Sequence, residues 1–214
     1  MQYLRVLAVQ YPTRQSAYTE IINLQAIENL PKGTEHFMSD LHGEYEAFRH
    51  ILNNCSGVIR EKVELLFDDS ISPRERADLC TLIYYPKEKL ALVRKNRQDS
   101  PQWYRVTLNR LIELAKFVSS KYSRSKVRKA MPPEFSYIID ELLHAQRDED
   151  DNQQVYHAKI IDSILDTDSE EDFIVALANL IKRLAVDHLH IVGDIYDRGP
   201  HADKILDILM NYHS

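Results

Sequence analysis

The spacing of apolar positions predicts helices along most of this chain. The clearest stripe has apolar side chains three or four positions apart and consists of Tyr104, Leu108, Leu111, Ala115, Val118 and Tyr122. Similar spacing recurs before Pro31, in residues 44–54, in about 134–146 and in 173–184. Serine and proline mark several helix starts, at a capping box from Ser72 to Glu75, at Ser100-Pro101 and at Ser169.

Two short segments break the helical period. Residues 35–39 alternate as an extended strand does, and residues 188–192 predict a buried strand that ends at Gly193. Each strand runs into a polar loop, and a helix follows each loop, the last over residues 202–212. The pattern therefore predicts an α/β fold, strongly helix-rich, with two strands.

Composition narrows the functional class. The 214 residues include only 5 glycines, which favours helices over an all-β fold with many tight turns. The net charge is −6, so no overall basic field attracts nucleic acid or an anionic membrane. No apolar run reaches the roughly 20 residues that span a bilayer, and the N-terminus shows no secretory signal. Cys55 and Cys80 are isolated thiols, which suits a reducing cytoplasm rather than a disulfide framework.

The two loops after the strands carry the candidate chemistry. The first contains Asp40 and His42 in an Asp-x-His pattern, followed by Gly43. A carboxylate and an imidazole two positions apart suit a borderline metal such as Mn²⁺, Fe or Zn²⁺, although this pattern alone is common. The second loop, Gly-Asp-Ile-Tyr-Asp-Arg-Gly at residues 193–199, is far more specific, because its charges have no evident structural purpose.

Together these loops resemble the first two signatures of the calcineurin-like metallophosphoesterases. The wider sequence resembles the class III fructose-1,6-bisphosphatases of Firmicutes-type bacteria, at residues 20–27, 30–36, 39–48 and 188–200. This resemblance implies a partial metallophosphoesterase core at 34–56 and 188–214, N-terminal helices at 1–33, and a large all-α insertion at 57–187. It also implies cytoplasmic hydrolysis of fructose 1,6-bisphosphate to fructose 6-phosphate and phosphate, in gluconeogenesis, by a homo-oligomer.

The resemblance further implies a role for each loop residue. Asp40 and His42 would bind the first of two divalent metal ions, most simply Mn²⁺, with Mg²⁺, Fe or Zn²⁺ as alternatives. Asp194 would bridge both ions. Asp197 would orient a catalytic histidine, and Arg198 would hold the phosphate of the sugar bisphosphate. The two ions would activate water and clamp the phosphoryl group.

The family's third signature, Gly-Asn-His followed by an acid, is absent, as are its later histidines. We therefore expect a truncated chain with three metal ligands and no general acid, inactive or nearly so alone. Two alternatives remain open: another phosphoesterase of the superfamily, and a non-catalytic helical assembly fragment with vestigial metal motifs.

Other charged groups admit simpler interpretations. A basic cluster could receive a second phosphate or an anionic effector, but is more typical of a solvated helix end; it consists of Lys121, Arg124, Lys126, Arg128 and Lys129. The acidic run at 148–151 lacks the pattern of a calcium loop. His188 and His190 share one face of a strand upstream of the loop, which favours core or edge histidines over metal ligands. Trp103, at the start of the long helix, is interpreted as a packing anchor.

Overall fold

The computed structural model describes residues 2–145 and 151–212 of the chain. Its elements within this part, in chain order, are α1 Gln2–Gln10, α2 Arg14–Ile27, β1 Glu35–Met38, α3 Tyr45–Asn54, η1 Cys55–Gly57, α4 Val58–Phe67, α5 Pro73–Tyr84, α6 Pro86–Lys95, α7 Pro101–Ser119, α8 Arg124–Ala130, η2 Pro133–Phe135, α9 Ser136–His144, α10 Asp151–Asp166, α11 Glu170–Ala185, β2 His188–Ile191 and α12 Ala202–Met210. The prediction of a helix-rich α/β chain with two strands is confirmed.

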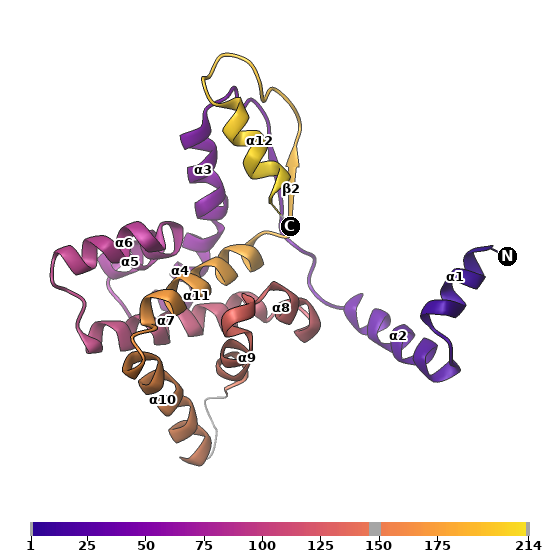
Figure 1. Cartoon of the computed structure of the whole chain (residues 1–214), viewed down its shortest axis with the longest axis horizontal. Coiled ribbons are helices and arrows are strands. Elements are labelled where there is room, and N and C mark those ends of the chain that lie inside the picture. Colours follow the sequence, from indigo (N-terminus) through magenta and orange to yellow (C-terminus); the bar gives the residue numbers. More distant parts are fainter. Residues whose placement is uncertain (1, 146–150, 213–214) are drawn as a thin grey trace.

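Helices α4 to α11 pack around one large apolar core, and we call them the helical body (Figure 1). The stripe on α7 faces inward, and Leu108, Leu111 and Ala115 have no exposed area. Helix α11 packs against α7 and buries Phe173, Ile174 and Ile181 completely. Regular apolar spacing on both helices explains this pairing, because each presents a continuous stripe to the other.

Serine capping is confirmed at two of the three predicted helix starts. Ser72 accepts a hydrogen bond from the Glu75 N–H and completes a capping box, and Ser100 caps α7. The prediction is wrong at Ser169: α11 begins there, but the Ser169 hydroxyl donates to the Thr167 carbonyl instead. Three acidic residues in the first turn of α11 complement its dipole in place of the cap.

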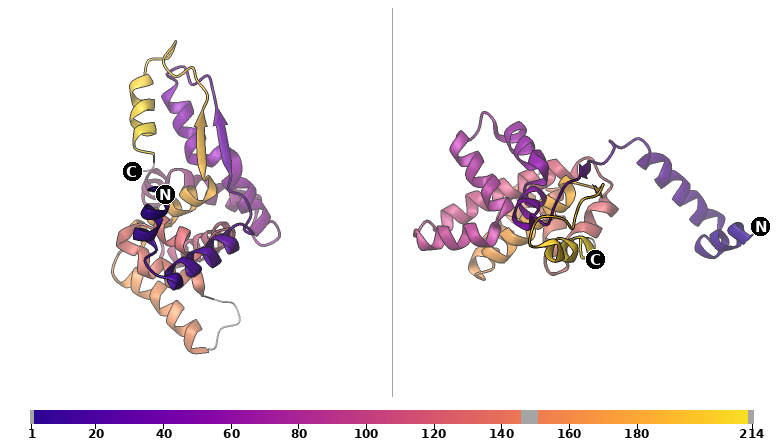
Figure 2. Two further views of the ribbon diagram at one scale, coloured as in Figure 1. Left: turned by 90° about the vertical axis from the view of Figure 1, so that its right-hand side faces the viewer. Right: turned by 90° about the horizontal axis from the view of Figure 1, so that it is seen from above.

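Strands β1 and β2 pair in parallel, with Glu35 opposite His188 and Met38 opposite Ile191. Helices α3 and α12 cover one face of this pair, around Leu41, Phe48 and Ile205, and the four elements form what we call the strand unit (Figure 2). The prediction that the second strand is buried is wrong. His188 and His190 are exposed, because no described element covers the other face.

Asp187 connects the helical body to the strand unit. Its side chain is 3% exposed and pairs with Lys126 and Lys121. It also accepts hydrogen bonds from the Tyr122 hydroxyl at 2.6 Å and the Thr34 N–H at 2.8 Å. These contacts hold the chain at the start of both strands.

The basic cluster therefore has a structural use. Lys121 and Lys126 serve the Asp187 junction, and Arg124 pairs with Asp140 at 2.9 Å. Thr34 precedes β1 and Asp40 follows it, so roughly 20 Å of extended chain separates the junction from the first motif loop. A bisphosphate bound at that loop would not reach these lysines.

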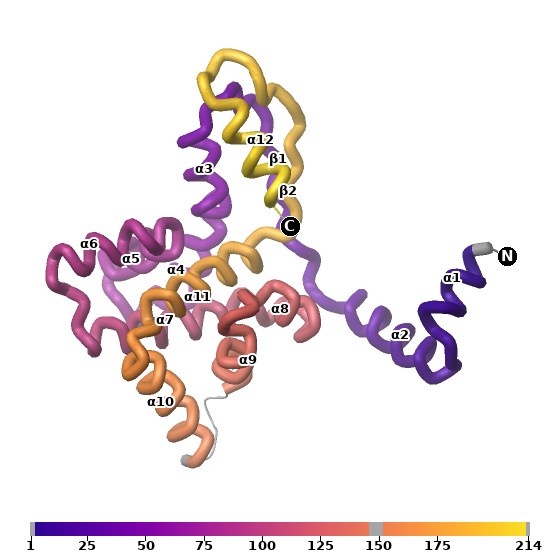
Figure 3. Tube along the Cα trace, viewed as in Figure 1, coloured from indigo at the N-terminus to yellow at the C-terminus, as the bar shows by residue number. Residues whose placement is uncertain are grey.

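The N-terminal helices α1 and α2 extend away from the rest of the molecule as an arm (Figures 1 and 3). Helix α2 buries no residue, although its apolar spacing is helical. Tyr3, Val9 and Ile22 are 74%, 84% and 67% exposed. Local sequence therefore determines the helices of the arm, while their apolar side chains contact no core among the described residues.

No helix in the described part of the chain is long and apolar enough to cross a membrane. Cys55 and Cys80 are both free and buried. Of the acidic run, residues 148–150 lie outside the described residues, and Asp151 begins α10.

Candidate active site

The two motif loops lie side by side at the carboxyl ends of β1 and β2 (Figures 1 and 2). Three backbone hydrogen bonds join them. The His42 N–H donates to the Asp194 carbonyl at 2.7 Å, and the Gly43 N–H donates to the Ile195 carbonyl at 2.9 Å. The Gly199 N–H returns a bond to the His42 carbonyl at 2.5 Å. Parallel pairing of the strands brings the two loops together, because both strands end at the same edge.

Gly43 and Gly199 allow this close approach. A Cβ atom on Gly43 would lie 2.5 Å from the Gly199 carbonyl oxygen, and one on Gly199 would overlap the His42 carbonyl. Both obstacles are backbone atoms, which cannot rotate away as a side chain can. Gly43 also has a φ of +71°, a left-handed conformation that glycine adopts without steric cost. The two glycines are therefore required by the contact between the loops.

Four of the five candidate site residues have left-handed backbone conformations. Their φ angles are +56° at Asp40, +46° at His42, +56° at Asp194 and +70° at Arg198. Non-glycine residues rarely adopt this region, and each costs of order 1–3 kcal/mol. Such strain often occurs at functional sites, and four of the eight non-glycine residues with positive φ in the described part of the chain lie on the two motif loops.

His42 has one ring nitrogen fixed by a carboxylate from the other loop. Its Nδ1–H donates to Asp197 Oδ1 at 2.6 Å, since an ionised carboxylate can only accept. This leaves Nε2, which lies 3.5 Å from Asp40 Oδ1. A carboxylate behind an imidazole orients the ring and raises its basicity toward a ligand on the far nitrogen.

The same bond affects the electrostatics of Asp197. The hydrogen bond from His42 lowers the pKa of the Asp197 carboxyl below its ordinary value, and desolvation opposes this without reversing it. Arg198 adds a contact from Nε to Asp197 Oδ2 at 3.4 Å. The carboxylate thus stays ionised across the neutral range and holds both side chains.

Asp194 and Arg198 lie on the outer surface of the second loop. Both are exposed, and the Arg198 side chain retains 77% of its accessible area. Among the described residues, no three His, Cys, Asp or Glu side chains gather closely enough to hold a metal ion. The structure therefore brings Asp40, His42 and Asp197 together through their side chains, and connects Asp194 to them only through the backbone.

Two further residues contact the motif loops. The Ser39 hydroxyl donates to Asp40 Oδ2 at 2.5 Å, and the His201 N–H donates to the Gly43 carbonyl at 3.2 Å. Ser39 precedes Asp40 directly, so its adjacency is visible once Asp40 is singled out. The role of the His201 backbone appears only when the loops are placed together.

The donor set fits a divalent cation in part. An orienting carboxylate, a free imidazole nitrogen and a second carboxylate 3.5 Å from that nitrogen are ligands that Mn²⁺, Fe and Zn²⁺ accept. Asp40 and His42 would supply two ligands to one ion.

Comparisons with known proteins identify the family. The family model described as Firmicute fructose-1,6-bisphosphatase matches residues 2–214. A class 3 fructose-1,6-bisphosphatase of Clostridium beijerinckii is 56% identical over the whole chain, which covers 33% of that relative. The corresponding proteins of Listeria innocua and of Clostridium botulinum strain Loch Maree are 56% and 55% identical, with 33% and 32% of their lengths covered.

No solved structure matches the chain. The chain spans about a third of the length of the curated relatives that it matches. Sequence identity above 50% over the whole chain, together with the family match, shows that the chain belongs to the Firmicute fructose-1,6-bisphosphatase family.

Proposed function

We propose that the protein to which this chain belongs hydrolyses fructose 1,6-bisphosphate to fructose 6-phosphate and inorganic phosphate. The observation that carries this proposal is the contact between the two loops, in which Asp197 of one loop fixes His42 of the other at 2.6 Å. Membership of the family and the activity for which its relatives are named support the choice of substrate.

In this proposal the chain's own residues bind and orient the reacting phosphate. Arg198 presents an exposed guanidinium whose planar fork suits two phosphate oxygens. Asp197 contacts both Arg198 and His42, so it couples the phosphate-binding group to the metal-binding group. Hydrolysis adds one water across the P–O bond, and the sugar oxygen leaves with a proton.

The proposed cofactors are two divalent metal ions, most simply Mn²⁺. Asp40 and His42 would hold one ion, and Asp194 would lie between the two. When bound, such ions supply Lewis-acid activation of water and charge neutralisation at the phosphoryl group. A partial metallophosphoesterase core around the strand unit, a homo-oligomeric state and a cytoplasmic location belong to the same proposal. The buried, unpaired thiols support a reducing compartment.

The test is phosphate release from fructose 1,6-bisphosphate with added Mn²⁺. It should be run on this chain and on a protein extended to the length of the relatives, each beside its Asp194→Asn variant. We expect turnover in the extended protein that the substitution abolishes, and little from the 214-residue chain, which holds three of the proposed ligands. Equal turnover in the extended protein and its Asp194→Asn variant would contradict the assignment of Asp194 as a metal ligand.

A further inference from the structure

A cleft of about 500 Å³ lies between the helical body and the strand unit, and its lining includes no residue of the motif loops. Helices α3, α11 and α12 supply most of its walls. Its lining consists of Tyr45, Arg49, Leu52, Asn53, Cys55, Asn179, Lys182, Arg183, Val186, Ile208 and Tyr212. Three of these residues are cations and none is a carboxylate, in a chain whose acidic residues outnumber its lysines and arginines by 33 to 27.

Two of the three cations lack a counter-ion within the described part of the chain. Lys182 is half-buried, and neither it nor Arg183 forms an ion pair there. Burial lowers the pKa of the Lys182 ammonium, and the electrostatic influence of the Cys55 thiol and of Glu88 only partly offsets this. The Glu88 carboxylate lies outside the cleft lining and pairs with Arg49 at 3.3 Å.

The position of Lys182 and Arg183 in α11 explains only part of the positive charge in the cleft. Lys182 and Arg183 fall in the last turn of α11, where a cation complements the helix dipole. The dipole accounts for an exposed cation such as Arg183. A half-buried ammonium without a partner carries a desolvation cost that an exposed one avoids, and a bound anion would offset that cost.

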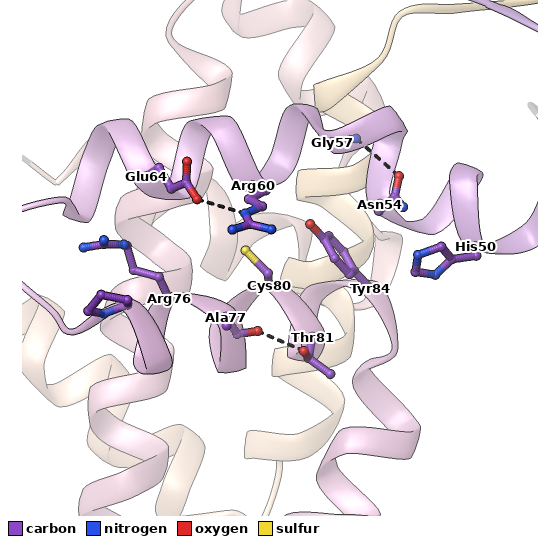
Figure 4. A pocket seen from close by; sticks show the side chains of 11 residues that line it. His50, Asn54, Gly57, Arg60, Glu64, Arg76, Ala77, Cys80, Thr81 and Tyr84 are labelled. Carbon is purple, nitrogen blue, oxygen red and sulfur yellow. Dashed lines mark hydrogen bonds and ion pairs between the residues drawn. The ribbon is translucent and has the colours of Figure 1, made fainter.

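Two other cavities with several cations show the contrast. In the cavity of about 440 Å³ shown in Figure 4, Arg60 donates to Glu64 at 2.9 Å, and both residues line it. In the cavity of about 590 Å³ beside α8, Arg124 pairs with Asp140, again within the lining. The cavity beside α8 still leaves Arg128 and Lys129 without an ion pair among the described residues. The cleft between α3 and α11 differs from both cavities because its lining contains no acid.

We propose that this cleft binds a small organic phosphate, with Lys182, Arg183 and Arg49 around the phosphate group. The chemistry of the lining supports that ligand class. Asn53 and Asn179 offer amide donors, while Leu52 and Ile208 provide an apolar wall for a carbon skeleton. The volume is within the range of small-molecule sites, which are mostly apolar with a few directed polar groups.

A ligand here would connect α3 of the strand unit to α11 of the helical body. Arg49 belongs to α3, which begins two residues after Gly43, and Lys182 belongs to α11 of the helical body. An anion held by both would fix α3, the helix that follows the first motif loop, against α11. The site is separate from the proposed phosphatase centre, and its occupancy does not depend on catalysis.

The experiment is a binding titration with glycerol 3-phosphate and with inorganic phosphate, followed by calorimetry and by ³¹P NMR. EDTA is present throughout, so that divalent ions cannot recruit phosphate to the motif loops. We expect saturable binding of glycerol 3-phosphate, weakened about tenfold or more in Lys182→Met and less in Arg183→Gln. Equal binding of inorganic phosphate would assign recognition to the phosphate group alone.

Two control variants locate the binding. Arg60→Gln removes a cation that Glu64 already pairs, and Arg198→Gln removes the guanidinium of the motif loop; neither should change the affinity. Circular dichroism and thermal unfolding verify that Lys182→Met is folded. Because that variant removes a desolvated charge, its unliganded form should unfold at a temperature no lower than the parent chain.

No saturable binding, or equal affinity in the parent chain, Lys182→Met and Arg183→Gln, would overturn the proposal. Affinity that is lost in Arg198→Gln but kept in Lys182→Met would move the site to the motif loop. That result would leave the proposed phosphatase function untouched.

Discussion

His42 and Asp197 form a hydrogen bond of 2.6 Å although 155 positions separate them in the chain. The bond joins the two motif loops through their side chains and leaves one imidazole nitrogen directed at Asp40. It makes Asp197 a positioning residue for the proposed metal site.

Asp197→Asn should weaken Mn²⁺ binding by about 10- to 100-fold, because the amide cannot fix the His42 ring as a carboxylate does. Calorimetric titration of Mn²⁺ into the chain measures this. Asp207→Asn, an exposed acid in the middle of α12, is the matched control and should leave the affinity unchanged. Equal affinities in the parent chain and Asp197→Asn would remove Asp197 from the site.

The motif glycines should differ in their tolerance of alanine. Gly43→Ala and Gly199→Ala place a Cβ against backbone atoms of the opposite loop, which should cost about 1–3 kcal/mol. Gly193→Ala meets no atom within 4 Å and should be close to neutral. Hydrogen exchange at the His42 N–H, which bonds the opposite loop, provides the readout. If Gly193→Ala accelerated exchange as much as Gly199→Ala, the steric explanation would be wrong.

Asp187→Ala should destabilise the fold by about 2 kcal/mol. The change leaves Lys126, the Tyr122 hydroxyl and the Thr34 N–H without the carboxylate that they share. Urea unfolding measures the loss of free energy. Asp69→Ala, an exposed acid after α4, controls for the removal of charge and should change stability by less than about 0.5 kcal/mol.

Glu75 provides a prediction about acid stability. Hydrogen bonds from the Ser72 hydroxyl, the Arg110 guanidinium and the Ser72 N–H lower the pKa of Glu75 to about 2. Its folded-state pKa lies below its ordinary value of 4.5, so its stabilisation is complete above that value. The contribution disappears as the pH falls from about 4.5 to about 2.

Unfolding curves over that pH range should therefore show a smaller loss of stability in Glu75→Gln than in the parent chain. Glu28→Gln, an exposed residue after α2, should retain the parent's slope. A parallel pH dependence in Glu75→Gln and the parent chain would show that the capping box does not retain its charge.

Removal of residues 1–30 should leave the thermal unfolding of the remainder unchanged, because α2 buries no side chain. By contrast, Leu108→Ala in the fully buried stripe of α7 should cost about 2–5 kcal/mol. Scanning calorimetry of the two variants compares them directly. A large drop on removing the arm would mean that its apolar residues pack against the body in solution.

The sequence was most informative where structure is local. The capping box at Ser72 and the stripe from Tyr104 to Val118 are read from residues within one helix, and both predictions hold. Ser169 shows the limit, since a serine before an acidic turn can bond to a neighbouring carbonyl as easily as cap the helix.

The site was predictable in its residue types but not in its contacts. The two motifs and their position after two strands follow from the sequence, whereas the bond from His42 to Asp197 depends on the register of strands far apart in the chain. The exposure of the second strand could not be predicted from its local pattern either. The short segment at residues 188–192, β-branched near its end, predicts a covered strand, yet His188 and His190 are exposed because no element among the described residues covers that face. The metal ligands and the domain boundaries stay predictions.

The separation of β1 and β2 has a consequence for synthesis on the ribosome. At about 5–20 residues per second, β2 follows β1 by roughly 10 to 30 s. During that interval β1 has no partner strand, while α4 to α10 emerge and find most of their contacts with one another. Because joining distant strands costs closure entropy, a helical body that folds first lowers the cost of pairing the two strands. We therefore expect a substitution that slows folding of the body to delay the meeting of the motif loops.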